Sequence, residues 1–149
     1  MLKLDRFLPY RLSVASNAVS TRISQSYRKQ FGLKVPEWRL IAILAERDSM
    51  TPQDIGQAGE LDKITVSRAA AALIERGLVA QRRNPEDGRS HFLSLTPDGR
   101  ALYTEIAPAA LALEAELLNG FSAEDRAALA ALLRRVEEAA RASMGSAER

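Results

Sequence analysis

The chain has 149 residues, of which 46% are hydrophobic and 27% charged, and its formal net charge is +2. This length and composition are typical of one soluble globular domain and exclude wholesale disorder. Charges interrupt every apolar run before it reaches the length of a membrane span or a signal peptide. We therefore expect a cytoplasmic protein with no membrane partner. The absence of cysteine and the single histidine, His91, exclude disulfides, thiolate chemistry, clustered zinc ligands and Ser-His-Asp catalysis, so we expect no enzyme, no cofactor and no metal.

Two helices are predicted in the first third of the chain. Apolar residues recur at helical spacing from about Pro9 to Phe31, and Gly32 supplies a C-terminal stop. Pro36 stands where the first turn of a helix tolerates proline, and Trp38 begins the apolar stripe of a second, shorter helix.

A short helix, a tight turn and another helix are predicted next. Thr51 is a capping residue, Pro52 takes the first helical position and Asp54 places an acid in the first turn, so a third helix starts here. A tight connection around Gly59 leads into a fourth helix from Lys63 to Arg76. Its apolar positions can face a core, which leaves an outer face of small polar and basic groups.

The pattern then changes from helix to strand. Residues 78–83 and 90–95 have the composition of two strands, with Leu93 and Leu95 on one face. Between them, residues 84–89 contain a proline and an Asp-Gly pair, which favour a turn. The sequence therefore predicts a β-hairpin whose tip carries charge.

Two more helices complete the chain. A second Thr-Pro start predicts a fifth helix from Pro97 to about Asn119, with Pro108 inside it at a position that can kink a helix. Gly120 ends this helix and Ser122 caps a sixth, whereas residues 143–149 are expected to fray.

A short helix, a tight turn, a second helix and a hairpin follow each other in the order of a winged helix-turn-helix. From Lys63 to Arg89, six basic residues stand against three acidic ones, although the whole chain is nearly neutral. A recognition helix needs small polar and basic groups on its outer face, and a wing needs cations at its tip. The candidate DNA-binding residues are Lys63, Thr65, Ser67, Arg68, Arg82, Arg83, Asp87, Gly88 and Arg89.

The charged candidates have distinct expected roles. Arg68 can read a guanine edge with two hydrogen bonds, and Arg89 at the hairpin tip can reach a minor groove or a phosphate. Asp87 is expected to fix an arginine and stiffen the hairpin, because DNA would repel a free carboxylate. Alone, the helix is more often a solvated face and the hairpin tip a plain turn, but their succession in this order favours DNA binding.

Several segments resemble the MarR family of bacterial regulators. Residues 62–68, Asp-Lys-Ile-Thr-Val-Ser-Arg, are similar to its recognition helix, and residues 72–79 to the junction that follows. The Asp-Gly-Arg run at residues 87–89 and the Phe-Leu-Ser-Leu-Thr-Pro-Asp-Gly run at residues 92–99 are similar to its wing. The resemblance extends over about residues 8–142.

This resemblance implies an architecture: a mainly α fold with a short β-hairpin, forming a single MarR-like domain over residues 1–149. A winged helix-turn-helix DNA-binding lobe would span about residues 36–96. The N- and C-terminal helices, about residues 8–31 and 97–142, would interlock with those of a second copy in a dimerisation lobe. Their apolar stripes agree with this, because a compact winged helix cannot cover all of them.

The resemblance also implies a function, that of a sequence-specific DNA-binding transcriptional regulator. The expected protein is a homodimeric repressor that binds a pseudo-palindromic operator of double-stranded DNA. A small aromatic or coenzyme A thioester ligand is expected to release it, by favouring a spacing of the two DNA-binding lobes that does not fit the operator. Two alternatives stay open. One is a ligand-independent winged-helix DNA-binding protein or activator, and the other is a winged helix that binds only proteins.

Residues 8–17 resemble family members linked to hydroxycinnamate degradation. Candidate ligand contacts are therefore Arg11, Ser16, Asn17 and Trp38, with Arg11 as a partner for a carboxylate or phosphate. The competing interpretation is that Trp38 belongs to the core and Arg11 is a surface charge. The absence of cysteine excludes a thiol-based sensor and the single histidine disfavours a zinc sensor, which leaves a small organic effector.

Overall fold

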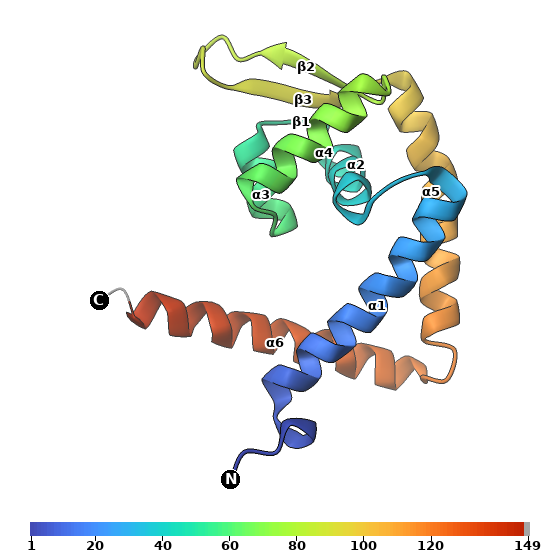
Figure 1. Ribbon diagram of the computed structural model, residues 1–149, viewed down its shortest axis with the longest axis vertical. Helices are drawn as coiled ribbons and strands as arrows, with labels where there is room; N and C mark the ends of the chain where they lie inside the picture. The colour runs from blue at the N-terminus through green and yellow to red at the C-terminus, as the bar shows by residue number, and fades with distance from the viewer. Residues whose placement is uncertain (148–149) are drawn as a thin grey trace. The chain divides into compact units, whose positions relative to one another are not determined.

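The structure is a computed structural model that describes residues 1–147, and it is mainly helical with one small antiparallel sheet, which confirms the predicted fold class (Figure 1). The chain forms two compact units, Met1–Pro108 and Ala109–Arg149. The elements in chain order are η1 (Leu4–Arg6), α1 (Leu8–Phe31), α2 (Val35–Arg47), β1 (Ser49–Met50), α3 (Pro52–Gly59), α4 (Lys63–Glu75), β2 (Val79–Arg83), β3 (His91–Leu95), α5 (Pro97–Leu117) and α6 (Ala123–Ala147).

The helix boundaries depend on the capping residues that the sequence indicates. At the start of α3, the Thr51 hydroxyl oxygen accepts a hydrogen bond from the Asp54 amide at 3.2 Å. Before α6, the side chains of Ser122 and Asp125 each accept from the other's amide, at 3.0 and 3.1 Å, which is a reciprocal capping box. Gly32 ends α1 in the left-handed conformation, with φ of 64°. These predicted starts and this predicted stop are confirmed.

The structure differs from the sequence prediction at the short helix η1, which was not predicted, at a third strand and at the C-terminal end. A third strand, β1, pairs with β3 in the register Ser49↔Ser94 and Met50↔Leu93, which gives the strand order β1-β3-β2. Two residues carry no readable period, so the sequence pattern cannot reveal such a strand. The expected fraying from residue 143 is wrong up to Ala147, where α6 is still helical, and residues 148–149 lie outside the described chain.

The core of the winged helix lies around α2, which packs against α3, α4 and β3. Its largest side chains are fully buried, and burying each of them contributes about 1.5–3 kcal/mol relative to exposure. The fully buried residues of this core include Leu33, Leu40, Ile41, Leu44, Ile55, Val66 and Leu73. The core therefore fixes α3 and α4 relative to the hairpin, and the hairpin projects beyond both helices (Figure 1).

A hydrogen-bonded junction joins the end of the sheet to α5. The Thr96 hydroxyl donates to the Gly77 carbonyl at 2.6 Å and accepts from the Gly99 amide at 3.0 Å, while the Thr96 amide donates to the Leu78 carbonyl at 3.1 Å. Gly99 packs so closely that a Cβ atom there would collide with the Leu78 carbonyl oxygen. The glycine is therefore required for this approach of α5 to the turn after α4.

Candidate nucleic-acid interface

Helix α4 has one buried face and one outward face. Its buried residues, which pack inside the winged helix, are Val66, Ala69, Ala70 and Leu73. Viewed down the helix axis, successive side chains are about 100° apart, so the mean direction of these four buried side chains can be calculated. The direction opposite to it falls within about 10° of Ile64 and about 30° of Arg68. Lys63 and Thr65 lie on opposite flanks of the helix, about 90° or more from this direction. The exposed outward face is thus centred on Ile64 and Arg68.

The N-terminus of α4 is held by Asp62. One carboxylate oxygen of Asp62 accepts from the Thr65 amide at 2.7 Å, and the other accepts from the Thr65 hydroxyl at 2.8 Å. These bonds, the amide bond first, hold the pKa of the Asp62 carboxyl below its ordinary value, because they favour the charged form. The proton of the Thr65 hydroxyl is therefore engaged in the helix cap.

The arginines of β2 point in different directions. Adjacent residues of a strand face opposite sides of the sheet, so Arg82 and Arg83 cannot contact one surface in the same way. The Arg82 guanidinium carbon lies 5.7 Å from the centroid of the Phe92 ring, a cation–π arrangement. An Nη atom of Arg83 lies 3.8 Å from the place where a Cβ of Gly88 would be, so this guanidinium reaches the hairpin tip.

The hairpin tip is ordered by short-range hydrogen bonds. The Asp87 carboxylate accepts from the Arg89 amide at 3.0 Å, and the Asp87 carbonyl accepts from the Ser90 amide at 3.1 Å. The Asn84 side chain accepts from the Glu86 amide at 3.0 Å in the same way. The expectation that Asp87 fixes an arginine needs correction in one respect: its carboxylate holds the backbone of Arg89, and the exposed Arg89 side chain extends from a turn stiffened by that bond.

A groove of about 700 Å³ lies between the helix-turn-helix and the hairpin. Lys63 from the flank of α4 and Arg89 from the hairpin tip both line it, together with Asp87 and His91. Ser67, Arg68, Arg82 and Arg83 do not line it, and Arg68 instead borders a smaller hollow of about 220 Å³ beside Lys34 and Thr65. The structure thus brings one cation from the helix and one from the hairpin to the same groove, which Asp87 also lines.

The four ligand candidates are not gathered in one place within the chain. Trp38 is half-buried in an aromatic cluster, with its ring centroid 5.2 Å from that of Tyr27 and 6.3 Å from that of Tyr103. Burial in this region raises the pKa of the Tyr27 hydroxyl. Arg11, Ser16 and Asn17 are exposed on the N-terminal half of α1, and Arg11 lies about 24 Å along the helix from Tyr27 at 1.5 Å per residue.

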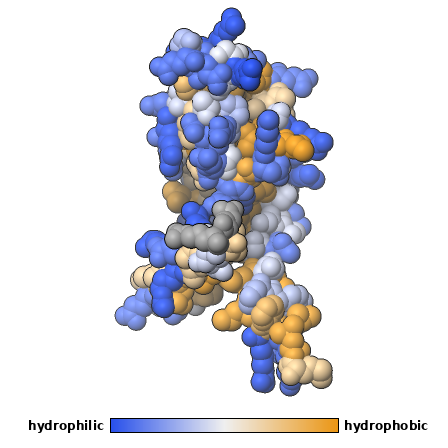
Figure 2. Space-filling model, turned by 90° about the vertical axis from the view of Figure 1, so that its left-hand side faces the viewer, coloured by the Kyte–Doolittle hydropathy of each residue, from blue (hydrophilic) through white to orange (hydrophobic). Residues whose placement is uncertain are grey.

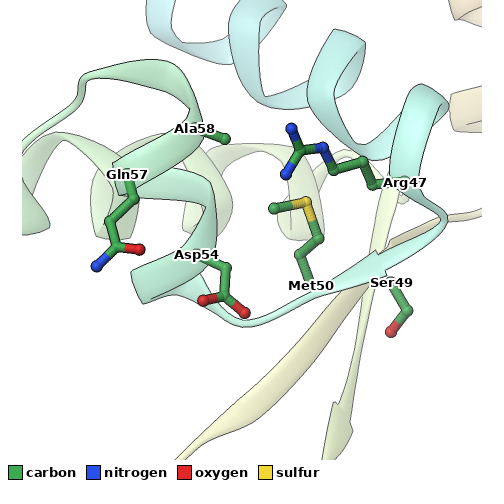
Figure 3. Close-up of a pocket in the computed structure, with 6 residues that line it drawn as sticks. All are labelled: Arg47, Ser49, Met50, Asp54, Gln57 and Ala58. Atoms are coloured by element: carbon green, nitrogen blue, oxygen red, sulfur yellow. The ribbon is translucent and has the colours of Figure 1, made fainter.

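A second hollow, of about 520 Å³, opens between the end of α2, β1 and α3 (Figure 3). Arg47 and Asp54 lie on either side of Met50 there, and none of these three residues is among the predicted site residues. Within residues 1–147, no group of three or more His, Cys, Asp or Glu side chains could hold a metal ion. None of the helices in that range is both long and apolar enough to cross a lipid bilayer.

Two residues with clear structural positions were absent from the predicted site. Ile64 lies at the centre of the outward face of α4. The sequence signal that could have indicated this is its spacing of four residues from Arg68, which places both side chains on one face of a helix. Arg76 donates from its guanidinium to the carbonyls of Phe31 and Gly32, both at 3.3 Å, and so joins the end of α4 to the end of α1. No local sequence pattern indicates such a long-range bond.

Comparison with known proteins agrees with this arrangement. The family model described as the MarR family matches residues 31–90. The uncharacterized HTH-type transcriptional regulator YwoH of Bacillus subtilis is 30% identical over 134 residues, covering 90% of this chain and 96% of the relative.

Solved structures are similar over nearly the whole chain. A MarR/EmrR family transcriptional regulator from Acinetobacter sp. ADP1 has a TM-score of 0.85 and 27% identity, covering 94% of this chain and 99% of that one. BpsR of Bordetella bronchiseptica, whose DNA binding is regulated by 6-hydroxynicotinic acid, has a TM-score of 0.81 and 26% identity. The match covers 87% of this chain and 98% of BpsR. The winged helix, its exposed basic groups and these relatives together establish that the chain belongs to the MarR family of DNA-binding transcriptional regulators and is not an enzyme.

Proposed function

We propose that the protein is a homodimeric repressor that places α4 in the major groove of its operator and the β2–β3 hairpin against the adjacent minor groove or phosphates. The observation that carries this proposal is the groove that Lys63 and Arg89 line together. A strand of phosphates passing through it would meet a cation from each element, and phosphate contacts of this kind set the position of a protein on DNA.

The predicted DNA contacts divide by position. On α4, Arg68 faces outward and is suited to read a guanine edge, while Lys63 and Ser67 are suited to phosphates. Thr65 supports these contacts through its bonds to Asp62, which fix the first turn of the helix. In the hairpin, the exposed guanidinium groups of Arg82, Arg83 and Arg89 supply positive charge, and Asp87 with Gly88 forms the turn that presents Arg89.

Exposed apolar side chains support a homodimer. All of α1 from Leu8 to Val19 is exposed, and that segment includes four large hydrophobic residues besides Tyr10. Helix α6 has no buried residue, although Leu132 and Val136 are large and apolar. Burying such side chains against a second copy stabilises both chains. The dimer would then read two half-sites whose centres are about 10 base pairs apart.

An aromatic carboxylate or a coenzyme A thioester is the proposed effector class. The regulation of BpsR by 6-hydroxynicotinic acid, an aromatic carboxylic acid, supports this class, as does the cluster of Tyr27, Trp38 and Tyr103. Since Arg11, on the exposed half of α1, is far from Trp38 in the same chain, it would join such a site from the second copy, as would Ser16 and Asn17. The ligand would cause release from DNA by binding more tightly to the protein conformation that does not fit the operator.

Fluorescence anisotropy with DNA from upstream of the gene tests this function. Tight binding that weakens steeply with salt, and release by one compound among aromatic acids and their coenzyme A thioesters, is the expected result. Tight binding that no compound releases would favour the ligand-independent regulator. Binding to DNA without salt dependence, or none at all, would contradict the proposal, and sedimentation of the free protein tests the dimer separately.

A further inference from the structure

Ile64 is an exception among the apolar residues of the winged helix. Between Val19 and Leu111 of the described chain, it is the one large hydrophobic side chain that is exposed, at 64%. The other exposed large hydrophobic residues lie before residue 20 or after residue 110, on segments that the proposed dimer would cover. A second copy docked on those segments gives no reason for an isoleucine on α4.

The position of Ile64 makes this exposure informative, since a single exposed apolar residue is ordinary elsewhere on a surface. It occupies the first turn of α4, at the centre of the outward face, and the N-terminal residues of a recognition helix are those that reach base edges. Ser67 and Ala71, its neighbours on that face, are small. Ile64 therefore projects further than they do towards anything that α4 contacts.

The chemistry of the major groove offers one apolar group to such a side chain. The edges of guanine, cytosine and adenine present hydrogen-bond donors and acceptors there, whereas thymine also presents its C5-methyl group. The side chain of isoleucine has no polar atom and is stiff at χ1, so it can recognise a methyl group but cannot form a hydrogen bond to a base. The Asp62–Thr65 bonds fix the turn that carries it.

We propose that Ile64 packs against the C5-methyl group of a thymine in each operator half-site, and so determines the base at that position. This inference rests on the proposed function, in which α4 enters the major groove. Arg68, on the same outward face, would read a neighbouring guanine, so that the two side chains select different bases. In a two-fold dimer, the two thymines occupy equivalent positions of the half-sites.

Replacing thymine by deoxyuridine tests the contact, because this change removes the methyl group and leaves base pairing intact. The full-length protein first selects its operator from a pool of random duplexes, and each thymine is then replaced in turn. Wild-type affinity should fall about fourfold per half-site at one position and about 15-fold when both half-sites are changed, the factors for removing one buried carbon group each. Thymines that flank the selected operator serve as the control, because their replacement should leave the affinity unchanged.

The Ile64→Ala variant completes the cycle. It should bind the thymine operator more weakly by a similar factor and become insensitive to deoxyuridine at that position, whereas Arg68→Ala should bind more weakly but keep that sensitivity. Circular dichroism and thermal unfolding should match the wild type, because the side chain is exposed. If Ile64→Ala keeps the wild-type response at every thymine, or no thymine responds, the contact does not exist. Failure to select any duplex in a salt-sensitive way would instead overturn the proposed function, and this inference with it.

Discussion

The winged helix buries its apolar residues within the chain, whereas the outer helices, α1 and α6, expose many of theirs. In the winged helix, residues such as Leu40, Leu44 and Leu73 are completely buried within the chain. In the N-terminal half of α1 and along α6, apolar side chains such as Leu12 and Leu132 stay exposed. Hydrophobic side chains lie on the surface at the N-terminal end of the molecule, at the bottom of Figure 2, whereas hydrophilic ones dominate the upper part, where the hairpin lies. The apolar residues of the winged helix are thus covered within one chain, whereas α1 and α6 expose apolar side chains that the proposed dimer would bury.

The largest effect should come from the core of the winged helix. Leu40→Ala removes a fully buried side chain from α2 and leaves a cavity, so we expect the free energy of unfolding to fall by about 2–5 kcal/mol. Urea denaturation at fixed protein concentration measures this decrease. The matched control is Ile64→Ala on the exposed face of α4, which should stay within about 0.5 kcal/mol of the wild type. Similar decreases for both variants would contradict the contrast between the two positions.

An outer leucine should behave differently from Leu40. Leu132 on α6 is 53% exposed in the chain, so Leu132→Glu should leave the winged helix folded but introduce a charge into the proposed dimer interface. We expect the dissociation constant of the dimer to rise about 30-fold or more, which corresponds to about 2 kcal/mol. Analytical ultracentrifugation measures it, with Leu132→Met as the apolar control of similar volume. A dimer of unchanged affinity would show that this face of α6 is not covered.

The junction between the winged helix and α5 should show an intermediate effect. Gly99→Ala places a methyl group against the Leu78 carbonyl, and the backbone must move to admit it, at a cost of about 1–3 kcal/mol in unfolding free energy. Thermal unfolding compares it with Gly120→Ala, where nothing lies within 4 Å of the added Cβ. A Gly99→Ala protein as stable as the Gly120→Ala protein would mean that the close approach does not restrict the fold.

The salt dependence of binding distinguishes the polar surface of the winged helix, which would bind DNA, from the apolar outer helices, which would bind a second copy. Arg89→Ala should weaken binding to all duplexes and reduce the slope of log affinity against log salt by about 1 for each phosphate that the variant no longer neutralises. The dimer, which depends on apolar burial, should not change. Arg28→Ala, an exposed arginine on α1, is the matched control. An unchanged salt slope for Arg89→Ala would refute the role assigned to the hairpin tip.

Local sequence patterns predicted most of the fold because its boundaries depend on local interactions. The Thr51 and Ser122 caps and the Gly32 stop form within a few residues of their partners, so their sequence signals were sufficient. The strand β1 and the bonds from Arg76 to the end of α1 were missed, since both join segments far apart in the sequence.

The candidate site could be predicted in composition but not in arrangement. Sequence order indicated a basic helix and a charged hairpin, and helical spacing separates Lys63, Ile64 and Thr65 around α4, but the buried residues of the structure are needed to show that Ile64 is the one that faces outward. It also gave Arg11 and Trp38 as candidate ligand contacts without indicating that the length of α1 separates them within one chain. Which side chains converge depends on helix phase and length, and these need atomic positions.

The smallest effect, and the sharpest contrast between charge and apolar burial, concerns the cap of α4. The side-chain oxygen of Asn can accept the bond from the Thr65 amide as Asp62 does, so Asp62→Asn removes the charge and keeps this capping bond, while the Thr65 hydroxyl loses its acceptor oxygen. The folded pKa of Asp62 is lowered, so its charge stabilises the fold fully above the ordinary value of 3.8, and this stabilisation is lost as pH falls through the lower folded pKa. Wild type should therefore unfold at a higher temperature than Asp62→Asn at pH 7, and the difference should shrink as the pH falls below 3.8 and through the lower folded pKa. A difference that does not vary with pH would mean that the charge contributes nothing, and that the α4 terminus, like the outer helices, is stabilised without electrostatics.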